Sequence, residues 1–386
     1  MWSKRTWLPE ALLCGLTLLC PGEFSQPLIA QPVTRCPSPD LPLAQRWDWA
    51  LREAGKLPKG STVWIGYSIL KPMRRNAFIG AIYSDARRNS PSLCEALGLD
   101  VCIKEAEPFR GMHNFTMTEG MTYIGDEEGG SEIIQKEIGI LFEMPSDKHT
   151  KMTAAVISNF SLHVDMHKEP VYWLGEAREE ESVALLIAKY NEGENDRIQK
   201  RIISIAGMQG ASDRVVTFLS NILEHGKQIS LRKEAAFWLG ETNSPEALRV
   251  LLKTAESETS RELIEESIFA ISQMDDSIGT EPLIRLAKTG KSREVRSKAM
   301  FWLGQKASRK STATLKEIIE DDDDTEIQKQ ALFALSQSES GGGVDELIRI
   351  AKTHRSPEVR KQAIYLLGES EDERALDVLV EIVRER

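Results

Sequence analysis

Apolar positions recur with two different periods along this chain. From Trp47 to about Phe160 they form short runs rich in β-branched and aromatic residues, which is typical of strands. From residue 161 onward they recur three and four residues apart, which is typical of amphipathic helices. We therefore expect an α+β multi-domain chain, in which a small β-rich domain precedes an all-α region.

The turn residues place the expected boundaries. The segment 31–46 is rich in proline and predicts an extended linker, and the β-rich domain is expected over 47–160. Glycine, proline, asparagine and aspartate separate its apolar runs. The clearest predicted strands are Thr62–Ile69, Ala77–Tyr83, Ile138–Phe142 and Thr153–Ile157.

The region 161–386 repeats one motif, which consists of an aromatic anchor, two core positions and then glycine or serine. The glycine or serine positions follow one another at nearly constant steps of about 32 residues, which indicates repeated supersecondary units. The seven positions are Gly175, Gly207, Gly240, Ser272, Gly304, Ser336 and Gly368.

Each unit has the pattern of two helices joined by a short polar turn. Neither helix can bury its apolar stripe alone, so stacking of successive units is expected to form a solenoid of seven helix pairs. We expect the glycine or serine to end the first helix, because glycine tolerates the left-handed conformation there.

One segment carries a family resemblance. Pro357–Gly368, with the pattern Val-Arg, Ala and Leu-Gly, resembles the first helix of a HEAT-like repeat of the phycobilisome-lyase (E–Z) subtype. A β-like domain before such units also resembles uncharacterised exported bacterial HEAT-repeat proteins. The resemblance implies a solenoid and leaves the activity open between an adaptor and a lyase-like or chaperone protein that handles a chromophore. Tetrapyrrole binding by the purified protein would distinguish the two.

A second period, two units long, lies over the first. Tryptophan occupies the core position in units one, three and five, whereas units four and six have Ala270 and Ala334. Alternation of large and small residues fills a close-packed core, so Trp302 is expected to be buried between these alanines. The alternative is a tryptophan row that stacks on a ligand. The tryptophans are Trp173, Trp238 and Trp302.

The N-terminal segment 1–30 has the composition of a signal peptide. Lys4 and Arg5 precede an apolar stretch over residues 11–20, and a cleavage site is plausible after Ala30. We therefore expect an exported protein, periplasmic or extracellular, without a transmembrane span after signal removal. In an oxidising compartment Cys94 and Cys102 could form a disulfide, with Cys36 left over. Reduced or incidental cysteines are the alternative.

One position of the second helices is charged throughout, at constant steps of one repeat unit. In HEAT stacks the second helices line the concave side, so this column could be a recognition strip for a protein or peptide with an acidic segment. Alternatively, it is a solvated face whose charges compensate one another. The column comprises Lys253, Arg285, Glu317, Arg349 and Glu381.

Other candidate chemistry is sparse. His163, Asp165 and His167 could hold a metal or form a polar junction, and the acidic run Glu320–Asp324 fits a helix-capping turn better than a calcium loop. The chain has no recognisable nucleophile–base or phosphate-binding motif. Its net charge of −10 argues against nucleic-acid binding. We expect a non-catalytic binding or scaffolding protein of the envelope with no cofactor. An enzyme with its site in the β-rich domain is the remaining alternative.

Overall fold

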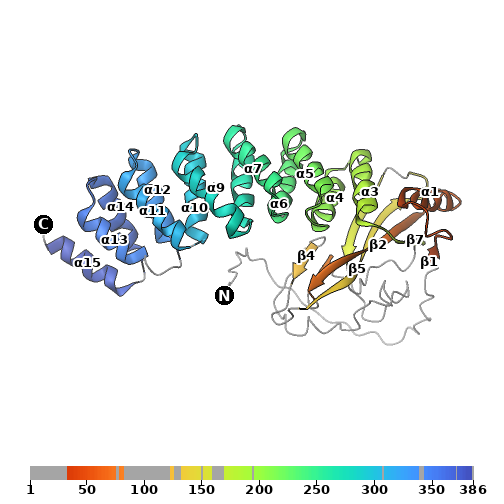
Figure 1. The fold of residues 1–386 in the computed structure, drawn as a ribbon, viewed down its shortest axis with the longest axis horizontal. Coiled ribbons are helices and arrows are strands. Elements are labelled where there is room, and N and C mark those ends of the chain that lie inside the picture. Colours follow the sequence, from red (N-terminus) through yellow and green to blue (C-terminus); the bar gives the residue numbers. More distant parts are fainter. Residues whose placement is uncertain are drawn as a thin grey trace, which may run out of the picture.

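The chain folds into a mixed β-sheet followed by a solenoid of paired helices, which confirms the expected fold class (Figure 1). The computed structural model describes residues 33–74, 78–81, 122–125, 132–148, 151–158, 169–193, 195–306, 308–338, 343–370 and 372–384.

The sheet has seven strands in the order β1-β7-β2-β5-β6-β3-β4 within these ranges. β1 and β7 pair in parallel, β7 and β2 also pair in parallel, and the other neighbours are antiparallel. The four predicted strands are present. The strand bounds are β1 Val33–Arg35, β2 Thr62–Arg74, β3 Phe78–Ala81, β4 Thr122–Gly125, β5 Ile133–Pro145, β6 Ala154–Ser158 and β7 Val171–Glu176.

Two predicted boundaries are wrong. The expected linker 31–46 contains strand β1 and the start of helix α1, Leu43–Ala54. The expected first solenoid unit also begins in the sheet, because Tyr172-Trp173-Leu174-Gly175 lies in strand β7. The β-branched and aromatic residues of this segment pair with β1 and β2 on either side, so strand pairing prevails over its resemblance to a helix-ending motif.

The solenoid therefore holds six helix pairs among the described residues, preceded by α3. The helix that follows the sheet is α3, Glu179–Glu192. The first helices are α4 Asp196–Met208, α6 Ile229–Glu241, α8 Arg261–Gln273, α10 Arg293–Lys306, α12 Thr325–Ser336 and α14 Pro357–Gly368. The second helices are α5 Asp213–His225, α7 Pro245–Ser257, α9 Asp276–Thr289, α11 Arg309–Asp321, α13 Gly343–Thr353 and α15 Glu373–Arg384.

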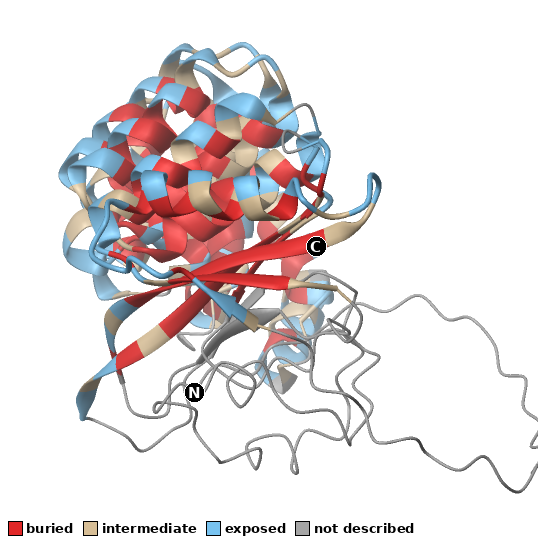
Figure 2. Ribbon diagram, turned by 90° about the vertical axis from the view of Figure 1, so that its right-hand side faces the viewer, coloured by how far each residue is buried: buried red, intermediate tan, exposed pale blue. Residues whose placement is uncertain are grey.

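The sheet closes the N-terminal end of the helical array (Figures 1 and 2). Alternate side chains of β2 and β5, among them Ile65 and Phe142, join the same apolar core as the helices. The Tyr67 hydroxyl lies 2.9 Å from Ser182 Oγ on α3, and Arg201 Nε on α4 donates to the Ala155 carbonyl of β6 at 3.2 Å. The solenoid thus continues the core of the sheet.

The repeated glycines serve a purpose other than the predicted one. Gly240 and Gly304 lie inside α6 and α10, and in the described chain positive φ angles occur only at Gly60, Gly175, Gly210 and Asn243. A Cβ atom on Gly240 would lie 2.6 Å from the Ala270 carbonyl oxygen, and one on Gly304 would overlap that of Ala334. Glycine therefore lets the next first helix approach closely.

This close approach explains the two-unit alternation and corrects the expected position of Trp302. The backbones of Ala270 and Ala334 lie directly against Gly240 and Gly304, so the small residues of one unit face those of the next. Trp302 is only half-buried, and its ring centroid lies 4.9 Å from that of Phe269. Trp238, by contrast, is buried and covers Gly207 of the preceding unit.

Candidate binding surfaces

The five charged residues of the predicted column lie on successive second helices, α7 to α15. Their side chains are between 45% and 61% exposed, as a recognition strip requires. They do not contact one another. Each forms an ion pair with the residue 29 positions earlier in the chain, on the preceding second helix. The pairs are Lys253–Glu224, Arg285–Glu256, Glu317–Lys288, Arg349–Glu320 and Glu381–Lys352.

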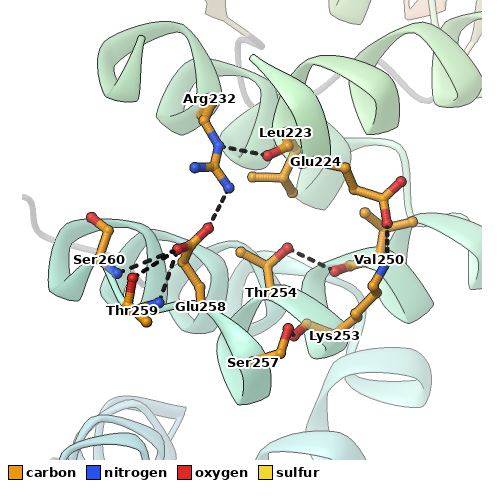
Figure 3. Close-up of polar contacts among 10 residues, drawn as sticks. All are labelled: Leu223, Glu224, Arg232, Val250, Lys253, Thr254, Ser257, Glu258, Thr259 and Ser260. Carbon is orange, nitrogen blue, oxygen red and sulfur yellow. Dashed lines mark hydrogen bonds and ion pairs between the residues drawn. The ribbon is translucent and has the colours of Figure 1, made fainter. Parts of the chain in front are cut away.

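These pairs form a continuous inter-repeat ladder, one rung of which is Lys253 Nζ to Glu224 Oε1 at 2.6 Å (Figure 3). Each column residue pairs with the side chain that follows the equivalent column position of the preceding second helix by three residues. The two partners are therefore 29 residues apart, which is three fewer than one repeat unit. Exposed ion pairs of this kind stabilise a fold by only about 0–1 kcal/mol each. The ladder thus neutralises much of the charge that a recognition strip would present.

A second set of charges joins neighbouring units at their loops. Arg232 Nε on α6 donates to the Leu223 carbonyl at 2.7 Å, and its guanidinium also bonds Glu258 (Figure 3). The Thr259 N–H donates to Glu258 at 2.9 Å. This backbone hydrogen bond and the Arg232 guanidinium lower the pKa of Glu258, although burial alone would raise it. Arg296, two units later, repeats the arrangement with the Ala287 carbonyl and Asp322.

The aromatic anchors of the first helices form a row that becomes more exposed toward the C-terminus. Phe237 and Phe269 are half-buried, with ring centroids 6.4 Å apart and ring planes 23° apart. Phe301 is 36% exposed, Phe333 41% and Tyr365 60%. Aromatic side chains of this kind are common at the centres of protein interfaces.

A hollow of about 580 Å³ opens beside this row, between the N-terminal halves of α8, α10 and α12. Helices α10 and α12 are in close contact at Gly304 and Ala334, toward their C-terminal ends. Phe301 follows Ser297 by four residues and Phe333 follows Gln330 by three, so both rings lie on the same helix faces as the hollow. The lining residues are Arg261, Arg293, Glu294, Ser297, Lys298, Glu326, Ile327 and Gln330.

The equivalent position between α6 and α8, two units earlier, is bridged by the chain itself. There Lys233 Nζ lies 3.7 Å from a carboxylate oxygen of Glu262 and 3.8 Å from one of Glu266. Ser297 stands at the position of Lys233 and Gln330 at that of Glu266. A serine side chain is too short to span the gap, and an amide forms no ion pair. These two replacements remove the bridge.

The charged groups around the hollow are already paired within the protein. Arg261 Nε lies 2.7 Å from Glu294, Lys298 Nζ lies 2.8 Å from Glu265, and Arg293 is paired with Asp324. Glu326 is paired with Lys329 on its own helix at 2.8 Å. The hollow is therefore lined mainly by polar side chains, with Ile327 as its apolar residue, and the Ser297 and Gln330 side chains are its uncharged polar groups.

Several predicted residues lie outside the described residues, namely Cys94, Cys102, His163, Asp165, His167 and the signal-like segment 1–30. Cys36 is described and carries a buried free thiol. The capping role of the acidic run is confirmed, because the Asp324 side chain accepts a hydrogen bond from the Glu326 N–H at 3.0 Å.

The part of the chain that the structure describes contains neither a metal-binding cluster nor a helix that could span a membrane. No group of three or more histidine, cysteine, aspartate or glutamate residues there is arranged to hold a metal ion. Among the helices that the structure describes, none is long and apolar enough to cross a bilayer.

The sequence reasoning missed the hollow, although a signal for it was present. When the two-unit modules are aligned, Ser297 stands at the position of Lys233. The second module therefore lacks a positive charge four residues before its aromatic anchor Phe301, and this difference in chemistry was visible in the sequence. That difference became interpretable only once the Lys233 ion pairs were known.

Comparison with known proteins identifies the repeat type. The sequence pattern of HEAT repeats matches residues 216–304 and 312–386. A search of curated proteins found no matching sequence. Human deoxyhypusine hydroxylase has a similar structure at 15% identity and a TM-score of 0.23, covering 52% of this chain and 85% of the hydroxylase.

The complex of CpcE and CpcF of phycocyanin lyase from Nostoc sp. PCC7120 is similar at 14% identity and a TM-score of 0.23. This match covers 48% of this chain and 97% of the lyase chain. At these scores the likenesses carry no functional argument. Residues 216–304 and 312–386 thus match HEAT repeats in sequence, and the structure shows consecutive helix pairs over the same parts of the chain.

Proposed function

We propose that this chain is a non-catalytic protein-binding or scaffolding protein that binds its partner in the hollow between α8, α10 and α12. The observation that carries the proposal is the difference between the two modules. In the first, the Lys233 ion pairs span α6 and α8, whereas in the second a hollow of about 580 Å³ lies on the helix faces that also carry the exposed Phe301 and Phe333. HEAT repeats suit this role because stacked units present extended surfaces.

The polar lining of the hollow and the exposed Phe301 and Phe333 favour an extended peptide segment that presents an apolar side chain to the two rings. Phe301 and Phe333 supply apolar contact area, and the Ser297 hydroxyl and Gln330 amide can bond the peptide backbone. Because the charged rim residues are paired internally, the affinity should depend weakly on ionic strength.

Proximity labelling in the native cell tests this proposal. A protein labelled by the wild-type chain should be lost with F301S/F333S and kept with I229S. Ile229 is a suitable control because it is 42% exposed and lies on α6, a helix that contributes no residue to the lining of the hollow. Equal labelling by all three chains would contradict the proposal.

The charged column is the second candidate surface, because its side chains are accessible at regular intervals. A partner with an acidic segment could exchange the internal ion pairs of Arg285 and Arg349 for its own carboxylates. R285E/R349E should then abolish labelling, and binding should weaken steeply with salt. Loss of the partner in this variant alone would assign recognition to the second helices.

We further propose that the protein acts in the cell envelope, on the strength of its N-terminal sequence. A C-terminally tagged chain should be recovered outside the cytoplasm and shortened by about 25–30 residues. In the exported protein we expect Cys94 and Cys102 to pair with each other rather than with Cys36. Mass mapping with all three thiols free would contradict this pairing.

A further inference from the structure

A pocket of about 310 Å³ lies between helix α1 and the segment that joins strand β1 to it. Its helix wall is formed by residues three and four positions apart, which therefore share one face of α1. The opposite wall, which comes from the joining segment, includes Cys36 and Leu41. The residues of the helix wall are Gln45, Asp48, Trp49 and Arg52.

Strand β7 holds both walls of this pocket in place. On one side, the Cys36 N–H donates a hydrogen bond to the Trp173 carbonyl at 2.9 Å. On the other, the buried Arg46 of α1 donates through Nη1 to the Leu174 and Glu176 carbonyls, each at 2.7 Å. Because the two walls are fixed to the same strand, the pocket is formed before a ligand binds, which lowers the entropic cost of binding.

The charged residues of α1 differ in whether the protein itself pairs them. Arg46 is bonded to β7, and Glu53 accepts a hydrogen bond from Lys56 Nζ at 2.6 Å. Asp48 and Arg52 form no hydrogen bond or ion pair through their side chains with any described residue, although they are four positions apart, the spacing of a helical ion pair. Both line the pocket. It therefore presents one unpaired carboxylate and one unpaired guanidinium from the same helix face.

Apolar surface adjoins these two charges. Trp49 is half-buried, and its ring meets that of Tyr172 on β7 edge to face, with centroids 6.1 Å apart. Leu41 in the opposite wall is 43% exposed. A ligand that covers Leu41 and the open part of the Trp49 ring would remove apolar surface from water, which favours binding.

We propose that this pocket binds a small zwitterion of the amino-acid type with an apolar side chain, either a free amino acid or a dipeptide. Arg52 holds the carboxylate, since a guanidinium matches a carboxylate with two parallel hydrogen bonds. Asp48 accepts hydrogen bonds from the ammonium group, and Trp49 and Leu41 contact the apolar side chain. A ligand with a single charge would leave one of the two side chains unpaired. The pocket lies on α1, remote from α10 and α12, so this proposal is independent of the one made for the hollow (Figure 1).

Isothermal titration calorimetry of the full chain with L-leucine tests this proposal. Leucine should bind, whereas N-acetyl-L-leucine, which lacks the ammonium group, and L-leucinamide, which lacks the carboxylate, should each bind about tenfold more weakly or less. Leucyl-leucine distinguishes the two sources of the ligand. Tighter binding of leucyl-leucine than of leucine would assign the pocket to dipeptides, and weaker binding would assign it to free amino acids.

Variants of the lining residues make the result specific. D48N and R52Q should each weaken leucine binding by about tenfold or more, because each removes a charge-assisted hydrogen bond. L41S should narrow the difference in affinity between leucine and glycine. D147N and K59Q make the same charge changes at exposed positions outside the lining, and they should leave binding unchanged.

All of these substitutions are at exposed positions, so the variants should fold, and circular dichroism checks that they do. Three results would overturn the proposal. These are the absence of binding heat with both leucine and leucyl-leucine, equal binding of leucine and either singly charged analogue, and leucine binding that survives both D48N and R52Q.

Discussion

Replacing Gly304 and Gly368 by alanine should have opposite effects on stability, although both glycines occupy the same position of the repeat. In G304A the new Cβ atom would overlap the Ala334 carbonyl oxygen and lie 3.0 Å from its carbonyl carbon. Both atoms belong to the backbone, so α12 must move away from α10. In G368A the Cβ atom meets no other atom within 4 Å.

The expected magnitudes follow from two opposing effects. Alanine in place of glycine in a helix interior stabilises by roughly 0.5–1 kcal/mol. Overpacking of a tight contact costs about 1–3 kcal/mol. G304A should therefore destabilise by up to about 2 kcal/mol, whereas G368A should be neutral or stabilising by less than about 1 kcal/mol because Gly368 is the last residue of its helix.

Urea denaturation followed by circular dichroism measures the difference, with hydrogen exchange reporting which helices loosen. G240A serves as a second test, because its Cβ atom would lie 2.6 Å from the Ala270 carbonyl oxygen. It should resemble G304A. Equal stability of G304A and G368A would refute the argument that glycine is needed for close approach between first helices.

Three further predictions concern the solenoid. W238A should destabilise by roughly 3–5 kcal/mol, and W302A by clearly less in the same denaturation assay, because Trp238 is buried and Trp302 only half-buried. R285E should change the free energy of unfolding by about 0–1 kcal/mol, and a loss of several kcal/mol would show that the ladder is structural. The lowered pKa of Glu258 stabilises the fold above its ordinary value of 4.5, and this contribution disappears as pH falls through the lowered value. R232Q should therefore cost most stability near pH 7 and progressively less in acid, and a constant difference would contradict this linkage.

Part of the fold could be predicted because the local hydrophobic pattern and the burial required by tertiary packing favour the same secondary structure there. A constant repeat period with apolar positions three and four apart admits only stacked amphipathic helices, since neither helix of a unit buries its stripe alone. The β2 strand was equally legible, because its run of β-branched and aromatic residues favours a strand, and the structure buries this run on both faces of the sheet.

The interaction surfaces could not be predicted in this way. The charged column was recognisable from its spacing, yet its pairing with residues 29 positions earlier depends on how far one second helix is displaced along the next. The hollow depends likewise on whether Lys233 or Ser297 occupies the gap between neighbouring first helices. Relative helix placement sets both features, and it does not appear in the pattern of a single unit.

By itself, the sequence determined the repeat, its period and the class of fold, because helix periodicity and the need to bury an apolar stripe act within a few residues. Only the tertiary structure decided the secondary structure of Tyr172–Gly175. This segment matches the repeated helix-ending motif in sequence, but it forms part of strand β7 between β1 and β2. Only the tertiary structure, too, separated the covered Gly240 and Gly304 from the open Gly368. The reason is the same in each case: identical local sequences acquire different roles from the neighbours that the rest of the chain brings against them.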